Sequence, residues 1–277
     1  MLTIINIDYL DSSSHARFMA SAPVLVLSPS VETVGDLTEV PRGLKGVIVA
    51  DTEVGDVRGR EGFYHYRQYS AIDLAQTRPL EDVWALMIDG ALPTSIAQRS
   101  AFVSEVSGLR ELPAPVADVL PVLAAASGPL AGLRTALSLL GAHDRMRPVL
   151  DLSHVERRAN VLRLCAVTPV ILCALHRHSV GLTPIDPRPD FTYAENYLWM
   201  MSGEVPGADR VRAIEQYLIS TVDHGFNAST FTARVITSTG ADSGPRRGGP
   251  RSALLSVERR CRNDHRRTER RSLRPHS

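Results

Sequence analysis

The sequence is poor in cysteine and in aromatic residues. Its 277 residues include 3 cysteines, and aromatic side chains make up 5% of the chain. Cys165, Cys173 and Cys261 are too few and too scattered for a disulfide framework or a zinc site, so no metal is predicted. Apolar residues reach 44%, which is ample for a buried core. This composition suits an alanine- and leucine-rich helical protein.

Secretory and membrane-spanning patterns are also missing. Residues 1–40 lack a basic region ahead of an apolar stretch and are interpreted as an N-terminal extension. The most apolar run, Val161 to Leu175, is short for a membrane span at about fifteen residues, and it contains Arg163 and Pro169. We therefore expect a buried helix in this run and a protein of the reducing cytoplasm that does not bind membranes.

Charge is distributed unevenly along the chain. The formal net charge is +1, but residues 1–242 hold 20 basic and 27 acidic residues, a balance of −7. Residues 243–277 hold 11 arginines and 3 acids, a balance of +8, with no lysine and no aromatic residue. Basic tails do bind phosphate backbones. Because this tail begins abruptly and lacks aromatics, we do not expect a nucleic-acid-binding arm.

Hydrophobic periodicity predicts a mainly α-helical fold with one small β-hairpin. Expected helices open at Ala71, run from Leu80 to a stop at Gly90, and cover residues 116–123, 133–140 and 155–176. Two further helices are expected from Arg210 to Val222 and from Ala228 to Ile236. The hairpin is expected to have a strand over 43–52, a turn over 56–62 and a returning strand over 63–67.

The junction between the last two predicted helices is the candidate functional site. It begins with Asp223-His224-Gly225. Gly225 permits a tight bend, and Asn227 is a good helix-opening residue. A histidine at such a junction can reach a cleft while backbone groups hold its ring. On these residues alone, a structural role for His224 is the commoner one.

Several sequence words around this junction resemble the bacterial type of citrate synthase, in order and at the family's spacing. They are Tyr193-Ala194-Glu195-Asn196-Tyr197-Leu198-Trp199-Met200-Met201, Gly203-Glu204-Val205-Pro206, Asp223-His224-Gly225-Phe226-Asn227-Ala228-Ser229-Thr230 and Ser238-Thr239-Gly240-Ala241-Asp242. Weaker matches are Gly90-Ala91-Leu92-Pro93-Thr94 and Gly132-Leu133-Arg134-Thr135-Ala136-Leu137-Ser138. Gln68 departs from the family, which has glycine there. The resemblance implies that residues 41–242 are a portion of the multi-helical large domain, with its small N-terminal hairpin.

The resemblance implies a catalytic role for His224. In the family this histidine donates a hydrogen bond to the thioester carbonyl of acetyl-CoA while the methyl group loses a proton. Acetyl-CoA then condenses with oxaloacetate and water to give citrate and CoA in the tricarboxylic acid cycle. Acetyl-CoA is a co-substrate, so no bound cofactor is expected, and the family forms homodimers. Two alternatives stay open: a 2-methylcitrate synthase that uses propionyl-CoA, and a non-catalytic partner of a full-length relative.

The resemblance stops after Asp242. The family's second histidine lies in a later "G-P-x-H-G-G" word, followed by the aspartate base and the arginines that bind oxaloacetate. Here an arginine-rich tail over 243–277 follows instead. A frameshift is the favoured interpretation; a deletion that leaves Ser243 to Gly249 as a remnant, with Arg247 at the histidine position, is the other. Either implies a largely missing small domain, an inactive chain on its own and an exposed apolar face on the last helix.

Other conspicuous residues receive structural interpretations. His176 and His178 are two apart, so on a helix they diverge and do not chelate together. Trp84 and Trp199 are expected in the core. Tyr66 and Arg67 serve either packing or a subunit contact, and the sequence does not decide between the two.

Overall fold

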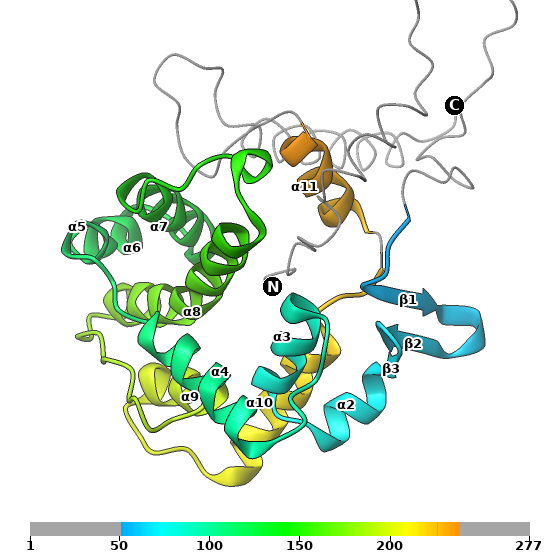
Figure 1. The fold of residues 1–277 in the computed structure, drawn as a ribbon. Coiled ribbons are helices and arrows are strands. Elements are labelled where there is room, and N and C mark those ends of the chain that lie inside the picture. The colour runs from blue at the N-terminus through cyan, green and yellow to red at the C-terminus, as the bar shows by residue number, and fades with distance from the viewer. Residues whose placement is uncertain (1–50, 226, 239–277) are drawn as a thin grey trace, which may run out of the picture.

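The computed structural model describes residues 51–225 and 227–238, and helices dominate these ranges (Figure 1). The helices are α2 (Ala71–Thr77), α3 (Leu80–Asp89), α4 (Ile96–Gly108), α5 (Ala114–Ala117), α6 (Leu120–Ala126), α7 (Pro129–His143), α8 (His154–Ser179), α9 (Tyr193–Ser202), α10 (Ala208–Ser220) and α11 (Ala228–Ser238), with 3-10 turns η3 (Gly59–Glu61) and η4 (Val149–Asp151). The predicted mainly α fold is confirmed. The N-terminal extension over 1–40, the tail over 243–277 and Cys261 lie outside the described residues.

The sheet has three short antiparallel strands in the order β1 (Gly55–Arg58), β2 (Phe63–Tyr66) and β3 (Tyr69–Ser70). The expected hairpin exists, but its predicted bounds are wrong. Residues 56–58, expected in the turn, belong to β1, and Val57 pairs with Tyr64 of β2. Asp51 and Thr52 are not in a strand, and residues 43–50 lie outside the described range. The true turn is shorter because Gly62, at φ +66°, reverses the chain directly after η3.

Arg67, expected at the end of the returning strand, instead occupies a left-handed turn position with φ +49°. Its backbone N–H donates to the Val54 carbonyl at 2.8 Å. The chain then enters β3 and α2, whose first turn is capped by the Ser70 hydroxyl accepting from Asp73 N–H at 3.2 Å. The side chains of α3 are largely buried, and α3 ends at Gly90 (φ +83°), as predicted.

The middle of the chain contains two departures from the predicted helices. Helix α4 was missed because Phe102 and Val106 are its buried side chains and give little periodicity. The helix expected over 116–123 is two helices, α5 and α6. Pro121 accounts for the break, since proline is tolerated in the first turn of α6 and disrupts a continuous helix.

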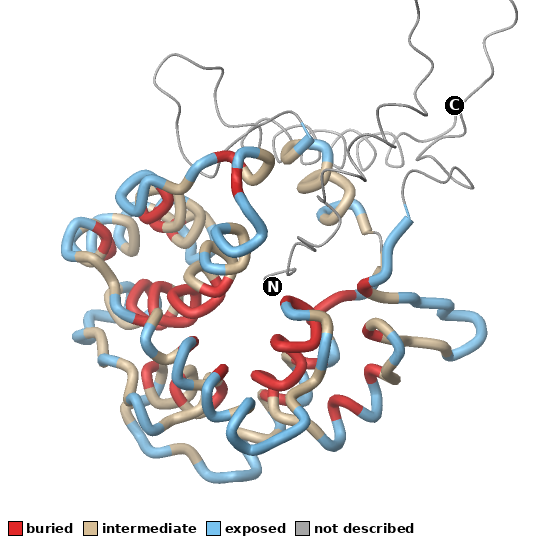
Figure 2. The backbone as a smooth tube through the Cα atoms, viewed as in Figure 1, coloured by how far each residue is buried: buried red, intermediate tan, exposed pale blue. Residues whose placement is uncertain are grey.

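Helix α8 is the central helix of the fold, and Figure 2 shows its middle among the buried segments. It packs against α4, α6, α7 and α9. Within the described residues it is the one helix long and apolar enough to cross a membrane by length and composition, and 56% of that window is buried inside the protein. Core helices meet the same two criteria. The expectation of a buried helix over 161–175 is confirmed, with Leu162, Ile171 and Leu175 at 2% exposure or less.

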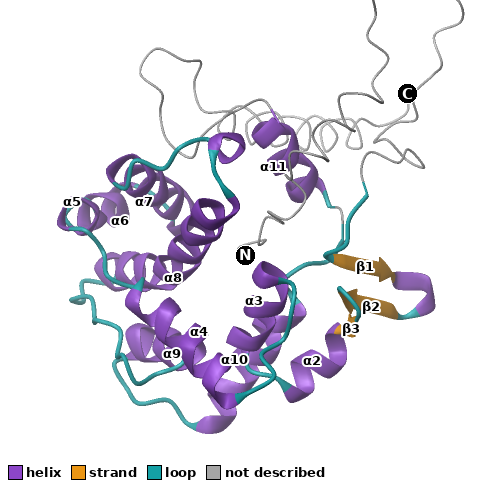
Figure 3. Cartoon of the chain, in the orientation of Figure 1, coloured by secondary structure: helices purple, strands orange, loops and turns teal. Residues whose placement is uncertain are grey.

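Helices α10 and α11 flank the candidate site, as predicted, and Figure 3 shows the loop that joins them. The centre of the buried face of α10 is Glu215 and Ile219. Helix α11 contains no buried residue, and Val235 on it is 46% exposed. The largest core cluster joins the sheet, α2, α3, α4, the first half of α8 and α10. This cluster includes the start of the α10–α11 loop and so anchors the loop to the core.

Candidate functional site

The Asp-His-Gly turn (residues 223–225) begins just after α10 and presents His224 to solvent. Gly225 has φ +88°, a conformation that residues with a side chain rarely adopt. Its N–H donates to Oδ2 of Asp223 at 3.1 Å, so the turn closes on itself. The structure therefore places the predicted site residue His224 at an accessible bend, with buried neighbours before it.

Asn227 lies next to the His224 ring and also begins α11. Its Oδ1 accepts hydrogen bonds from the N–H groups of Ser229 at 2.8 Å and Thr230 at 3.0 Å, which makes it the predicted helix cap. Its Nδ2 lies 3.2 Å from Nε2 and 3.5 Å from Nδ1 of His224. Because Oδ1 is occupied by the helix, the amide NH₂ is the group turned toward the imidazole.

Asp223 is buried, with 7% of its surface exposed. Burial raises the pKa of this carboxyl, and the Gly225 N–H and the adjacent His224 partly oppose that effect. The carboxylate lies against strand β1, where a Cβ added to Gly55 would come within 2.5 Å of Asp223 Oδ2. The turn and the hairpin are thus in direct contact, although most of the described chain separates them in the sequence.

Sequence reasoning missed the hairpin residues that touch this turn, Gly55 and Tyr64. The Tyr64 hydroxyl contacts the carbonyl of Ser220, the last residue of α10, and that of Asp223 in the turn. The available signal was the placement of Tyr64 and Tyr66 two apart, which puts both rings on one face of a strand. No sequence pattern indicates which helix end such a face would meet.

Tyr66 and Arg67 both make packing contacts within the chain. Tyr66 is fully buried. Arg67 donates from Nε to the Leu86 carbonyl at 2.9 Å and from Nη2 to the Met87 carbonyl at 3.2 Å. These carbonyls belong to the last turn of α3, where a cation is favourable.

The described residues contain no group of three or more His, Cys, Asp or Glu that could hold a metal ion. Trp84 is 5% exposed and belongs to the core, as expected. Trp199 is half-buried, and its Nε1 donates to the Asp186 carbonyl at 3.1 Å. The described part of the chain thus offers one accessible histidine in a constrained turn as its candidate site.

Comparison with known proteins identifies the family. Residues 43–244 match the family model described as "Citrate synthase, C-terminal domain". The chain is 38% identical to a 2-methylcitrate synthase of Mycobacterium tuberculosis over 215 residues, covering 78% of this chain and 53% of that protein. It is also 38% identical to a citrate synthase of Mycolicibacterium smegmatis over 210 residues, covering 76% and 55%. The chain spans about half the length of the curated relatives it matches.

Solved structures agree. The crystal structure of citrate synthase from Pyrobaculum aerophilum matches with a TM-score of 0.66 and 30% identity, covering 77% of this chain and 56% of that one. The enzyme from Thermotoga maritima matches with a TM-score of 0.64 and 29% identity, covering 73% and 52%. The match in sequence and the match in fold cover most of this chain. The chain belongs to the citrate synthase family.

Proposed function

We propose that this chain provides the His224 half of a citrate synthase site, which condenses acetyl-CoA with oxaloacetate and water to give citrate and CoA. The observation that carries the proposal is the accessible imidazole at the Asp-His-Gly turn, fixed between two helices. No bound cofactor is needed, because acetyl-CoA is itself a substrate. The proposed location is the cytoplasm.

The proposed role of His224 follows from where charge develops in the reaction. Removing a proton from the methyl group of a thioester moves negative charge onto the carbonyl oxygen. A fixed N–H donor stabilises that charge, whereas water must first reorganise. A neutral imidazole has one N–H and one lone pair. The Asn227 amide NH₂ faces the ring, 3.2 Å from Nε2 and 3.5 Å from Nδ1, so one ring nitrogen accepts from it and the N–H on the other is the donor proposed for the substrate.

A chimera tests the proposal with a measurable turnover. Residues 43–242 of this chain replace the matching stretch of the M. smegmatis enzyme, and CoA release is followed with acetyl-CoA and oxaloacetate. We expect turnover in the chimera and, with His224→Gln, a loss of about 10²-fold or more, as for removal of an oxyanion donor. His154→Gln, an exposed histidine on α8, is the matched control. Equal activity of the His224→Gln and parent chimeras would reject the proposal.

A second candidate substrate is propionyl-CoA. It is favoured by the similarity to the M. tuberculosis 2-methylcitrate synthase, which equals the similarity to the M. smegmatis citrate synthase at 38% identity. Comparing kcat/KM for the two acyl-CoA substrates in the chimera, against the unmodified recipient enzyme, separates them. A shift of preference toward propionyl-CoA would assign part of that specificity to residues 43–242.

We further propose that the polypeptide of these 277 residues has negligible activity alone and pairs through its large-domain helices with a copy of itself or with a full-length relative. Val122 on α6 and Leu130 on α7 are 66% and 72% exposed, which leaves apolar area for such contacts. Assay of the purified chain tests the first statement, and robust turnover would refute it. Co-purification with a tagged full-length relative tests the second, and a strictly monomeric, unpaired chain would refute that.

A further inference from the structure

We propose that the β1–β2 hairpin positions the His224 imidazole through two contacts with Asp223, one from the Tyr64 hydroxyl to its carbonyl and one from the backbone of Gly55 to its carboxylate. This inference rests on the proposed function, because it assigns the hairpin a role through the residue proposed to act on the substrate. Tyr64 and Gly55 are accordingly positioning residues, and neither touches the reacting atoms.

The first contact is made by the two tyrosines of β2. The Tyr64 hydroxyl donates to the carbonyl of Asp223 and also lies 2.9 Å from the carbonyl of Ser220. The Tyr66 hydroxyl donates to the carbonyl of Ile219 at 2.5 Å, and the two hydroxyl oxygens are 2.8 Å apart. The last carbonyls of an α-helix have no partner within the helix. The tyrosines therefore bind the end of α10 and the first carbonyl of the turn together.

The second contact is possible because Gly55 on β1 has no side chain. Gly55 allows the Asp223 carboxylate to approach the strand, and an added Cβ would lie 2.5 Å from Oδ2 and 3.2 Å from the His65 carbonyl. The same Oδ2 accepts the Gly225 N–H, which closes the turn around His224. Moving this carboxylate would therefore break the hydrogen bond that closes the turn.

The geometry distinguishes a positioning role of the Tyr64 hydroxyl from a role of its ring in core packing. Tyr64 is half-buried, and its ring can pack without its hydroxyl. The Asp223 carbonyl to which it donates is in the peptide bond that leads to His224. Losing this hydrogen bond frees the peptide immediately before the imidazole, while the aromatic contact with Tyr66, at 5.3 Å between ring centroids, is retained.

The test compares Tyr64→Phe with Tyr217→Phe, an exposed tyrosine of α10, and Gly55→Ala with Gly59→Ala, a hairpin glycine with no atom within 4 Å of an added Cβ. The two NMR readouts on the full chain are the contact between the His224 ring and the Asn227 amide, and hydrogen exchange of the Gly225 N–H. We expect Tyr64→Phe and Gly55→Ala to weaken the ring contact and to accelerate Gly225 exchange about 5- to 10-fold, the loss expected for one hydrogen bond. The two controls should change neither.

The outcomes distinguish positioning from stability. If Tyr64→Phe or Gly55→Ala lowers the melting temperature but leaves the ring contact and Gly225 exchange unchanged, the residue is structural and the proposal is overturned for it. Both readouts are made without substrate, so neither result depends on whether the chain takes part in acyl transfer. A substrate-free result as expected, together with equal activity of the His224→Gln and parent chimeras, would reject the proposed function and leave the hairpin contact intact.

Discussion

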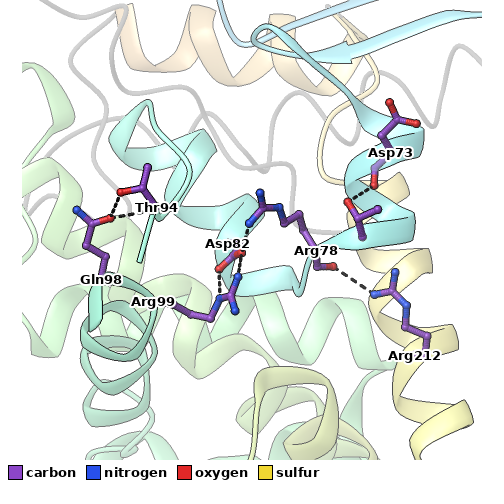
Figure 4. A network of polar contacts seen from close by, with 8 residues as sticks. Asp73, Arg78, Asp82, Thr94, Gln98, Arg99 and Arg212 are labelled. Atoms are coloured by element: carbon purple, nitrogen blue, oxygen red, sulfur yellow. Dashed lines mark hydrogen bonds and ion pairs between the residues drawn. The ribbon is translucent and has the colours of Figure 1, made fainter. Parts of the chain in front are cut away.

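Arg99 donates two parallel hydrogen bonds to the carboxylate of Asp82, from Nε to Oδ1 at 2.7 Å and from Nη2 to Oδ2 at 2.6 Å (Figure 4). Asp82 is fully buried on α3, whereas the Arg99 side chain on α4 is 40% exposed. Arg78 approaches the same carboxylate at 3.5 Å. The pair therefore attaches α4, the helix that sequence periodicity missed, to the most buried helix of the core.

Replacing Arg99 with alanine should leave the Asp82 charge buried with only a long contact to Arg78. We expect Arg99→Ala to lower the free energy of unfolding by about 2 kcal/mol, less than for a fully buried pair because Arg99 is partly solvated. Urea denaturation measures this. Arg60→Ala, at an exposed hairpin arginine, should stay within about 0.5 kcal/mol. Equal effects of the two substitutions would show that the pair contributes no net stability.

Glu81 predicts a pH dependence of stability. It is 2% exposed, and its Oε1 accepts the Tyr193 N–H at 2.7 Å. Burial raises the pKa of Glu81 above the ordinary value of 4.5. Between the two pKa values the folded state keeps a proton on Glu81 that the unfolded state has lost. The stability that this proton gives to the fold is therefore fully present below pH 4.5, and it is lost as the pH rises through the pKa of the folded state.

Glu81→Gln removes this titration. Relative to the variant, the parent chain should lose unfolding free energy as the pH rises above 4.5, measured by urea denaturation at several pH values. The raised pKa of buried Asp223 acts in the same direction in both proteins and cancels from the comparison, whereas the interaction between Glu215 and Glu81, which helps to raise the pKa of Glu81, is part of the measured difference. Glu204→Gln, an exposed position, is the control. A parent chain that gains stability relative to Glu81→Gln over this range would contradict the prediction.

The two described cysteines should be unreactive in the folded protein. Cys165 and Cys173 are free and buried on α8, and burial raises the pKa of each thiol to about 12. Since the thiolate is the reactive form, both should resist iodoacetamide at about pH 8 and react once the chain is unfolded in urea. Mass spectrometry of the separate peptides measures each site. Labelling of Cys165 in the native state at the rate of a free peptide would refute the burial.

Asn227 should set the tautomer of His224. In Asn227→Asp, carboxylate oxygens can still cap α11, but an acceptor now faces the imidazole in place of the amide NH₂. Because an acceptor in this position favours a proton on the nitrogen that faces it, we expect the distribution of the ring proton between Nδ1 and Nε2 to change. The ¹⁵N chemical shifts of the ring report this directly. Asn160→Asp, on helix α8, is the control, and an unchanged His224 tautomer in Asn227→Asp would exclude the proposed contact.

The sequence by itself determined the helical class, the family and the place of His224. Helix ends marked by local chemistry, such as Gly90 and the Asn227 cap, were predicted because the relevant contacts lie within a few residues. The Asp-His-Gly turn was predicted for the same reason, since glycine alone tolerates φ +88° without strain. Patterns of this kind need no knowledge of distant segments.

Only the tertiary structure decided what surrounds the turn. Helix α4 is attached to the core by Phe102, Val106 and the Arg99–Asp82 pair, and the hairpin bounds depend on how β1 pairs with β2. The contacts of Tyr64 and Gly55 with Asp223 join segments far apart in the chain. Periodicity shows that a face will be buried but not against which partner, because burial is non-directional and the partner is chosen by packing of the whole core.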